Sequence, residues 1–224
     1  YGHNLTWDEM LWLANWCFVR GHNLLIPHAF YYSIRGPRFD ERPPDVGPNS
    51  AWWKDYKPYA DACRRMSWLN TDSRHICDIA ILCEATWLPD ASAKILYQNQ
   101  KDFNYLEIRH LWEDVKVSGL GVHIAGMTYK AVILDTLSHI PDAAIPVLKK
   151  IARKKHLIVQ SGSPLTPFLR GALMYKTGED LLNAVKKISS PDLTLSVPSP
   201  GLRYPPTRAN IGSGTPYFRW RKHR

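Results

Sequence analysis

The sequence predicts an α/β fold, a mostly parallel sheet flanked by helices. Short apolar runs that read as buried strands lie at 76–82, 130–135 and 157–160. Segments with helical periodicity and capping residues lie between them. Alternation of this kind is typical of parallel sheets, because each helix provides the crossover to the next strand. The three runs are therefore expected to form the core of the sheet.

A helix and a short strand are expected ahead of the sheet. Thr6 and Glu9 have the spacing of a capping box, and apolar residues follow at helical spacing as far as Phe18. The run "NLLIPH" at 23–28 reads as a buried strand. A long loop is expected to follow over 29–50.

Three further segments have the helical period. The first begins near Ala51, and Pro58 within it either kinks the helix or marks a start near Lys57. The second is "FNYLEIRHLWEDVKV" at 103–117, and the third covers 142–155. They are expected to supply helices around the sheet.

One more helix and a change of composition complete the chain. Thr177 and Asp180 predict the cap of a helix at 178–188. After Ser189 the sequence is rich in Pro, Ser and Gly, as linkers are. A linker and a basic tail are therefore expected over 191–224.

Composition and charge restrict the possible partners. Lys and Arg number 29 against 20 Asp and Glu, which gives a formal net charge of +9. A basic balance permits nucleic-acid binding, but part of the excess lies in the last six residues, "RWRKHR", which read as a solvated tail. Nucleic acid is therefore kept as an alternative that the sequence does not favour. No apolar run reaches the length of a membrane span, so no membrane partner is expected.

The common signatures of cofactor, metal and nucleophile sites are absent from the sequence. It contains no Walker loop, no GxGxxG and no GxSxG nucleophile elbow. The nine histidines show neither HxxxH nor HExxH spacing, and the four cysteines form no CxxC pair. Neither a cofactor nor a metal is expected.

The stretch "LIPHAFYYSIRGPRFDERPPDVGPNSAWW" at 25–53 gathers groups that can stack on a ligand and hydrogen-bond to it. Trp52 falls on the apolar stripe of the helix that follows, so packing competes with ligand binding there, whereas Trp53 lies off that stripe. For His28, a structural hydrogen bond is an equal alternative. The candidate ligand-binding residues are His28, Tyr31, Tyr32, Arg38, Trp52 and Trp53.

Three carboxylates are the candidate catalytic residues. Asp40 and Glu41 lie in the loop after the first expected strand. Glu84 follows the strand that ends near Leu82, at the edge where ligands gather in open α/β sheets. For each of them a solvated loop position is the alternative.

Several motifs, in order, resemble a known family. "NWCFVRGHNLLIPHAFYYS" and "RPPDVGPNSAWWKDY" resemble the late part of the catalytic barrel in glycoside hydrolases of the α-L-rhamnosidase type, family 106-like. "DIAIL", "DFNYL", "GLGVHIAGMTYKAVIL" and "LKKIARKKHLIVQSGSP" are similar, in the same order, to the glutamine-amidotransferase-like, flavodoxin-like α/β domain behind that barrel. "PDLTLSVPSPGLRY" resembles the entry into a β-sandwich, so the resemblance covers roughly 4–205.

The resemblance implies a carbohydrate-active, glycoside hydrolase-like protein that acts on O-glycosidic bonds, with rhamnosides as a substrate class. It implies the last helix and strand of a (β/α) barrel over 1–50, and an amidotransferase-like domain over 51–190. Most of the barrel would precede this chain and would supply the catalytic carboxylates, so none is carried over. His28, Tyr31 and the loop through Asp40 map to the barrel mouth, which implies sugar contacts for them.

The sequence departs from the family pattern in three places. Cys83 and Glu84 stand where a proline-led turn is usual, "ARKKHLIV" lacks a glycine pair before its strand, and "SGTPYFRWRKHR" does not continue as a sandwich strand. A noncatalytic carbohydrate-binding or structural α/β module is therefore the alternative. In either case the strand at 23–28 would expose an edge, so we expect a second copy of the chain or an upstream barrel domain to cover it.

Overall fold

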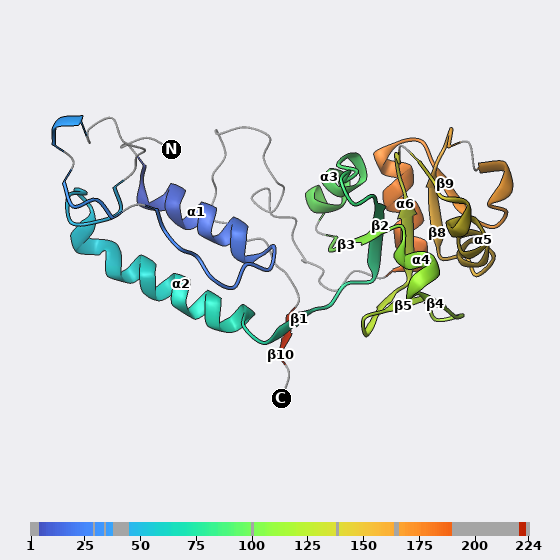
Figure 1. Cartoon of the computed structure of the whole chain (residues 1–224), viewed down its shortest axis with the longest axis horizontal. Helices are drawn as coiled ribbons and strands as arrows, with labels where there is room; N and C mark the ends of the chain where they lie inside the picture. Colours follow the sequence, from blue (N-terminus) through green and yellow to red (C-terminus); the bar gives the residue numbers. More distant parts are fainter. Residues whose placement is uncertain are drawn as a thin grey trace. The chain divides into compact units, whose positions relative to one another are not determined.

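The computed structural model divides into two compact units (Figure 1). One unit comprises Tyr1–His75 with Thr215–Arg224 and is called the helical unit below; the other, Ile76–Gly214, is called the α/β unit. The division differs from the one expected at residue 50, since the helix after the loop belongs to the first unit. The structure describes residues 5–28, 30–33, 35–37, 45–99, 101–137, 139–163, 166–189 and 220–222.

The first helix begins where the sequence predicts. α1 covers Trp7–Phe18, and Thr6 caps it. The Thr6 side chain accepts a hydrogen bond from the Glu9 backbone N at 3.3 Å, and the Thr6 N donates to Glu9 Oε2 at 3.0 Å. The capping box is therefore complete.

The second helix also forms, without a kink at its proline. A short 3₁₀ turn, η2 (Trp53–Asp55), leads into α2 (Tyr56–Asn70). Pro58 lies in the first turn of α2, where backbone N–H groups have no partner within the helix, so its missing N–H breaks no helical bond. Of the two alternatives that the sequence left open, the start near Lys57 is confirmed.

The prediction of a strand at 23–28 was wrong. Residues 22–27 belong to no helix or strand, and Ile26 is 84% exposed. A strand needs backbone partners, and within the described residues of the helical unit the one strand pair is β1 (Ser73–His75) with β10 (Trp220–Lys222), which run antiparallel. Part of the expected basic tail therefore forms a strand.

The α/β unit contains the parallel sheet that the sequence predicts. Its five strands have the order β3-β2-β7-β8-β9, and every neighbouring pair is parallel. The three runs expected at its core supply the three inner strands. Each residue of β2 and β7 is buried, as expected for strands covered on both faces. The strands are β2 (Ile79–Cys83), β3 (Asn104–Glu107), β7 (Ala131–Leu134), β8 (Leu157–Gln160) and β9 (Leu173–Tyr175).

Helices cover both faces of this sheet (Figure 1). α3 (Ala91–Gln98) and α6 (Gly178–Ile188) pack on one face, and α4 (His110–Glu113) and α5 (Ile145–Arg153) pack on the other. α6 has the predicted bounds and the predicted Thr177 cap. A 3₁₀ turn, η3 (Asp142–Ala144), precedes α5, so the helix expected from residue 142 begins as a tighter turn. The fold class predicted from the sequence is confirmed.

The prediction of one helix over 103–117 was wrong. The segment forms β3, the short α4 and then β4 (Lys116–Val117). Phe103, Leu106 and Ile108 are buried here. The first two are three residues apart, as on a helix, and the last two are two apart, as on a strand, so the spacing does not decide. Pairing with β2 decides for the strand. β4 continues into an antiparallel sheet with β5 (Val122–Ile124) and β6 (Met127–Tyr129).

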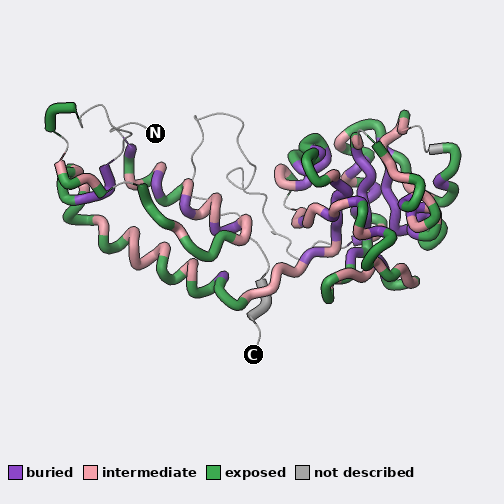
Figure 2. Tube along the Cα trace, in the orientation of Figure 1, coloured by how far each residue is buried: buried purple, intermediate pink, exposed green. Residues whose placement is uncertain are grey.

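Burial differs strongly between the units (Figure 2). In the α/β unit the buried residues follow the sheet strands and the inner sides of the helices. In the helical unit one small cluster consists of Leu5, Met10 and Val46, with partly buried rings around them, and Ala14, Phe18 and Val19 are buried as well. No helix within the described ranges is long and apolar enough to cross a bilayer.

Candidate functional site

An aromatic cluster joins α1 to the start of α2 in the helical unit. Trp7 packs against Trp52, with ring centroids 5.4 Å apart, and against Tyr59 at 5.6 Å. The Trp52 indole N–H donates to the Leu5 carbonyl at 3.2 Å. Trp52 is half-buried and its indole N–H is paired, so it has the packing role that the sequence left open, and its partner is Trp7 of α1.

The exposed side of the same cluster lies on the loop before α2. Trp53 stacks on Tyr56 at 5.4 Å and 23°, and Phe30 meets Trp53 edge-on at 5.9 Å and 86°. Trp53 remains 37% exposed and Phe30 53% exposed. His28 lies 6.2 Å from the Tyr31 ring in a T-shaped arrangement. These four rings can offer apolar faces and an imidazole to a ligand in water.

Asp45 holds this loop in place. Its Oδ1 accepts the Gly47 backbone N–H at 2.8 Å and the Tyr31 backbone N–H at 3.2 Å. Asn49 reinforces the contact by donating from Nδ2 to the Tyr31 carbonyl at 2.9 Å. A Cβ at Gly47 would lie 3.0 Å from Asp45 Oδ1 and 3.2 Å from Phe30 Cδ1, so the glycine lets the chain pass there.

The second oxygen of the same carboxylate is buried and unpaired. Asp45 is 5% exposed, and its Oδ2 has no hydrogen-bond partner in the parts of the chain that the structure describes. A buried unpaired carboxylate oxygen costs roughly 1–3 kcal/mol or more, so a donor that reached it would recover a hydrogen bond. Sequence reasoning missed Asp45, although "DVG" has the pattern of an Asp side chain that bonds to the backbone two residues on.

Tyr59 and Cys63, two potential nucleophiles with shifted pKa values in the described part of the cluster, are not activated. Burial raises the pKa of the Tyr59 phenol above its usual range, and the neighbouring Cys63 thiol adds to the shift. Burial likewise raises the pKa of Cys63, although a hydrogen bond with Tyr59 opposes that effect. Both groups are therefore neutral near pH 7, so neither is present as the anion that would act as a nucleophile.

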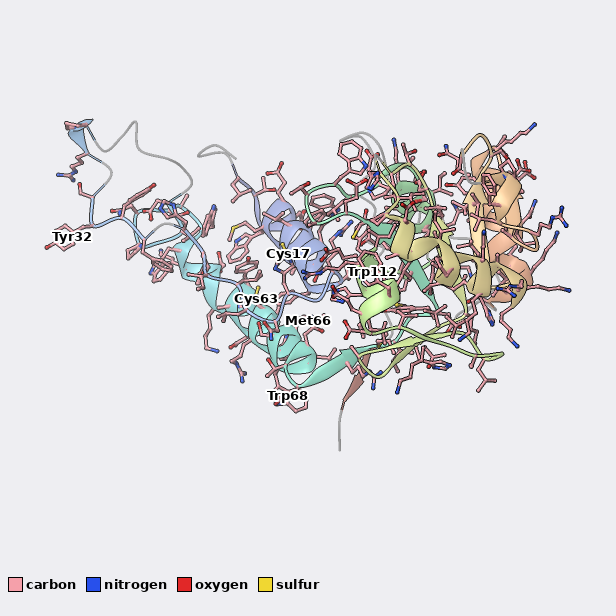
Figure 3. All side chains as sticks on the ribbon, turned by 45° about the vertical axis from the view of Figure 1, so that its right-hand side comes forward. Cys17, Tyr32, Cys63, Met66, Trp68 and Trp112 are labelled. Atoms are coloured by element: carbon pink, nitrogen blue, oxygen red, sulfur yellow. The ribbon has the colours of Figure 1, made fainter. Side chains whose placement is uncertain are left out.

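The other predicted residues fall in different places. Tyr32 is 99% exposed and projects away from the helices (Figure 3). Arg38, Asp40 and Glu41 lie outside the described residues. Glu84 lies in the α/β unit, whereas the aromatic cluster belongs to the helical unit.

Glu84 directly follows β2 at the carboxyl edge of the sheet, as the sequence indicated. Two hydrogen bonds join the segment after β2 to the segment after β7 at this edge. The His139 backbone N–H donates to Glu84 Oε1 at 3.2 Å, and the Trp87 indole N–H donates to the Thr136 carbonyl at 3.2 Å. These hydrogen bonds join the two loops at the edge where ligands bind in open α/β sheets.

Asp135 follows β7 at the same edge and is also used structurally. Its Oδ2 accepts from the Ser92 backbone N at 3.0 Å at the start of α3, and its Oδ1 accepts from the Thr136 backbone N at 2.8 Å. A carboxylate is favoured there by the helix dipole. Tyr175 OH is buried without a hydrogen bond of normal geometry, and burial followed by the Asp135 charge raises the pKa of this phenol above its usual range.

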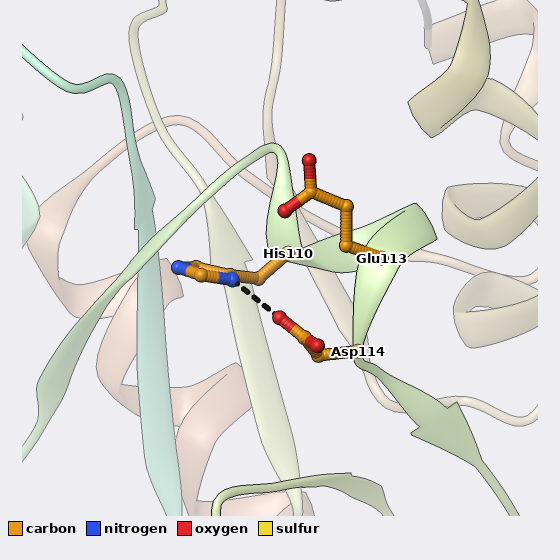
Figure 4. A group of neighbouring side chains, drawn as sticks. All are labelled: His110, Glu113 and Asp114. Atoms are coloured by element: carbon orange, nitrogen blue, oxygen red, sulfur yellow. Dashed lines mark hydrogen bonds and ion pairs between the residues drawn. The ribbon is translucent and has the colours of Figure 1, made fainter.

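One group of side chains has the composition of a metal site. Ligand atoms of His110, Glu113 and Asp114 lie within 4.8 Å of one another on α4 and just after it (Figure 4). The His110 Nδ1 already lies 2.7 Å from Asp114 Oδ2, and Arg109 lies 4.0 Å from Glu113 and 3.2 Å from Glu107. The carboxylates are exposed, and a cation of the chain stands beside them, so the group is accounted for as surface ion pairs.

Comparison with known proteins adds a likeness of fold. No protein-family model matches the sequence, and no curated protein matches it. A solved structure does match: that of a rhamnosidase from Novosphingobium sp. PP1Y, with a TM-score of 0.54 and 17% sequence identity. The fold resembles part of a rhamnosidase. The match covers 83% of this chain and 21% of the rhamnosidase chain, so this chain spans about a fifth of that protein's length.

Proposed function

We propose that this chain is part of a carbohydrate-active, glycoside hydrolase-like protein and that its aromatic surface binds a sugar. The aromatic surface consists of His28, Phe30, Tyr31 and Trp53 and is held by Asp45. One observation carries the proposal: Trp53 remains 37% exposed beside Phe30, while Asp45 holds the loop with one oxygen and its other oxygen has no partner among the described residues. Likeness of fold to a rhamnosidase supports the choice of sugar, and rhamnosides are the class to test first.

Weak binding is expected from such a surface. A stacked ring and a hydrogen bond each contribute about 1 kcal/mol net. After the cost of association is subtracted, two or three such contacts give a dissociation constant of roughly 1 mM or weaker. Upstream segments of a barrel would add contacts, and we propose that such a barrel or a second copy of the chain is the protein partner of the helical unit.

The test is binding of L-rhamnose to the parent and to Trp53→Ala, measured by chemical-shift titration. We expect the variant to lose binding and to keep its fold, because Trp53 lies off the buried stripe. Trp68→Ala is the matched control: Trp68 is 67% exposed on α2 and projects on the side away from α1 (Figure 3), so its removal should leave binding unchanged. Unchanged binding by Trp53→Ala, or unfolding of that variant, would contradict the proposal.

A noncatalytic role for the α/β unit is the second candidate, and one observation favours it. The Glu84 carboxylate accepts a backbone hydrogen bond from His139, and the Trp87 indole N–H donates to the Thr136 carbonyl at the same edge. Release of nitrophenol from an aryl α-L-rhamnoside separates the two candidates. Turnover that disappears in Glu84→Gln would favour catalysis at this edge, while binding without turnover would favour the noncatalytic role.

A further inference from the structure

We propose that the outer side of α5 and the turn after it bind an anionic polysaccharide. The proposal rests on the proposed carbohydrate function, and it goes beyond that function by naming a second surface, in the other compact unit, and the charge of its ligand. The surface is called the cationic face. It consists of Lys149, Lys150, Arg153, Lys154, Lys155 and Arg170, with Phe168 beside them.

Helical geometry places the α5 cations together. Five of the seven residues from 149 to 155 are Lys or Arg, and none is acidic. At ~100° per residue, the four cations from Lys149 to Lys154 fall within an arc of ~140°. The opposite side of the helix carries Leu148, Ile151 and Ala152, which are 0% exposed in the core. The positive charge therefore points away from the sheet.

Nothing in the described part of the chain neutralises this charge. No residue of the cationic face forms an ion pair there, whereas Lys130 pairs with Asp78 at 2.8 Å and Arg109 pairs with Glu107 at 3.2 Å. Like charges three and four residues apart on a helix repel each other. The cations of the face therefore repel one another, and a polyanion would remove the repulsion.

The helix dipole accounts for only part of the charge. Cations in the last turn stabilise any helix, and α6 shows the ordinary arrangement. It carries Lys186 and Lys187 in its last turn and balances them with Glu179 and Asp180 in its first. α5 has no acidic residue in its first turn. α6 therefore provides a matched control within the same unit.

Lys155 is a second indication that a positive charge has a role at the end of α5. Its φ is 62°, a left-handed conformation that favours glycine. The Lys155 N–H donates to the Ala152 carbonyl at 2.9 Å and the His156 N–H to the Ile151 carbonyl at 3.2 Å, which is the bonding of a helix end that usually carries glycine. A lysine here breaks a local preference and adds a cation to the face.

A neighbouring turn extends the surface. A Cβ at Gly171 would lie 2.8 Å from the Ala152 carbonyl oxygen and 3.6 Å from the Arg153 Cα, so this turn passes directly against the end of α5. Arg170 is exposed and precedes that glycine. Phe168 is 59% exposed, and Lys149 Nζ lies 5.9 Å from its ring centroid.

These features fit an acidic glycan better than a nucleic acid. Single strands of nucleic acid are bound by several rings on which successive bases stack, together with a charged groove. The cationic face offers one ring among six cations. One ring can cover one sugar face, while the cations attract carboxylate or sulfate groups along the chain.

The probes are polygalacturonate, neutral dextran and a single-stranded oligonucleotide, in affinity electrophoresis at 50 and 200 mM NaCl. We expect polygalacturonate to retard the parent, dextran not to, and the higher salt to weaken the retardation. Lys150→Glu with Lys154→Glu should lower affinity about tenfold, since it removes two exposed charge contacts. The control, Lys186→Glu with Lys187→Glu, changes the net charge equally and should lower affinity less than about twofold.

Lys155→Gly separates binding from stability. Glycine suits the left-handed backbone, so this variant should melt at a higher temperature than the parent and yet bind polygalacturonate more weakly. A parent that polygalacturonate does not retard, or equal losses in the two double variants, would overturn the proposal. Tighter binding of the oligonucleotide through the same residues would overturn it in favour of nucleic acid. Trp53→Ala should leave this binding unchanged, so failure of the sugar site and failure of the cationic face are distinguishable.

Discussion

In the α/β unit all five residues of β2 are buried, whereas α2 in the helical unit buries Asn70 alone among its 15 residues. A parallel sheet covered on both faces removes whole strands from water. Two helices in contact remove one stripe each and leave the remaining side chains at the surface. The aromatic surface, where we propose that a sugar binds, lies in the unit that buries fewer of its residues.

Two buried carboxylates, one in each unit, differ in their hydrogen bonding. At the sheet edge, Asp135 finds backbone donors from Ser92 and Thr136 with both of its oxygens. In the helical unit Asp45 accepts two hydrogen bonds at Oδ1, while its Oδ2 has no partner within the described ranges. Completed hydrogen bonding favours a structural role, and an unpaired buried oxygen favours a ligand or a partner segment.

The largest expected effect contrasts the two cores. Ile133 is fully buried in β7, and Met10 belongs to the small core of the helical unit. Ile133→Ala should lower the free energy of unfolding of the α/β unit by about 2–5 kcal/mol. Met10→Ala should cost less, since the helical unit can collapse around the gap. Hydrogen exchange resolved by segment measures both, and equal costs would mean that the helical core is as complete as the sheet core.

The second comparison concerns one exposed apolar side chain in each unit and its effect on self-association. Ile26 is 84% exposed in the segment at 22–27, and Leu120 is 77% exposed in the α/β unit. We expect the chain to self-associate and Ile26→Lys to weaken association about tenfold, because burial of one such side chain contributes roughly 1.5–3 kcal/mol. Leu120→Lys is the control and should change nothing. Sedimentation that shows a monomer for the parent at every concentration would count against the idea.

The capping boxes allow the same substitution, threonine to alanine, to be compared in the two units. Thr6 and Thr177 accept from Glu9 and Asp180 backbone N–H groups at 3.3 and 3.2 Å. Thr177→Ala should lower the free energy of unfolding of the α/β unit by about 1 kcal/mol. Thr6→Ala should speed hydrogen exchange in α1 and leave the sheet unchanged. Serine at either position keeps the hydroxyl, so a serine variant as damaged as the alanine variant would contradict the capping role.

The smallest effect concerns two exposed carboxylates. The hydrogen bond from Lys57 lowers the pKa of Asp61, and backbone hydrogen bonds from Thr177 lower the pKa of Asp180. A lowered folded-state pKa means that the stabilisation is present above the ordinary carboxyl pKa and is lost as the pH falls through the lowered value, below about pH 4. In 0.5 M salt the Asp61 shift should shrink and the Asp180 shift should persist, because salt screens an exposed ion pair more than a backbone hydrogen bond. Carbon NMR titration that shows equal salt effects would contradict this assignment of causes.

Local signals account for the elements that were predicted correctly. The capping boxes at Thr6 and Thr177 fix the starts of α1 and α6 within three residues of sequence, so no tertiary partner is needed to read them. The buried strands at β2, β7 and β8 were recognised because each is short, apolar and flanked by turn residues. The location of Glu84 at the carboxyl edge of the sheet followed from the same reading.

By itself, the sequence determined the α/β class, the inner parallel strands and the stretch at 25–53 where stacking groups gather, since these depend on apolar runs and composition. Only the tertiary structure decided that 104–107 is a strand, because the pairing with β2 outweighs a helical period that fits equally well. It also decided that 23–28 is not one, since a strand requires partners that the described helical unit does not provide. The tertiary structure also decided the role of Asp45, because its carboxylate can hold the loop only when folding brings Tyr31, fourteen residues away, next to it.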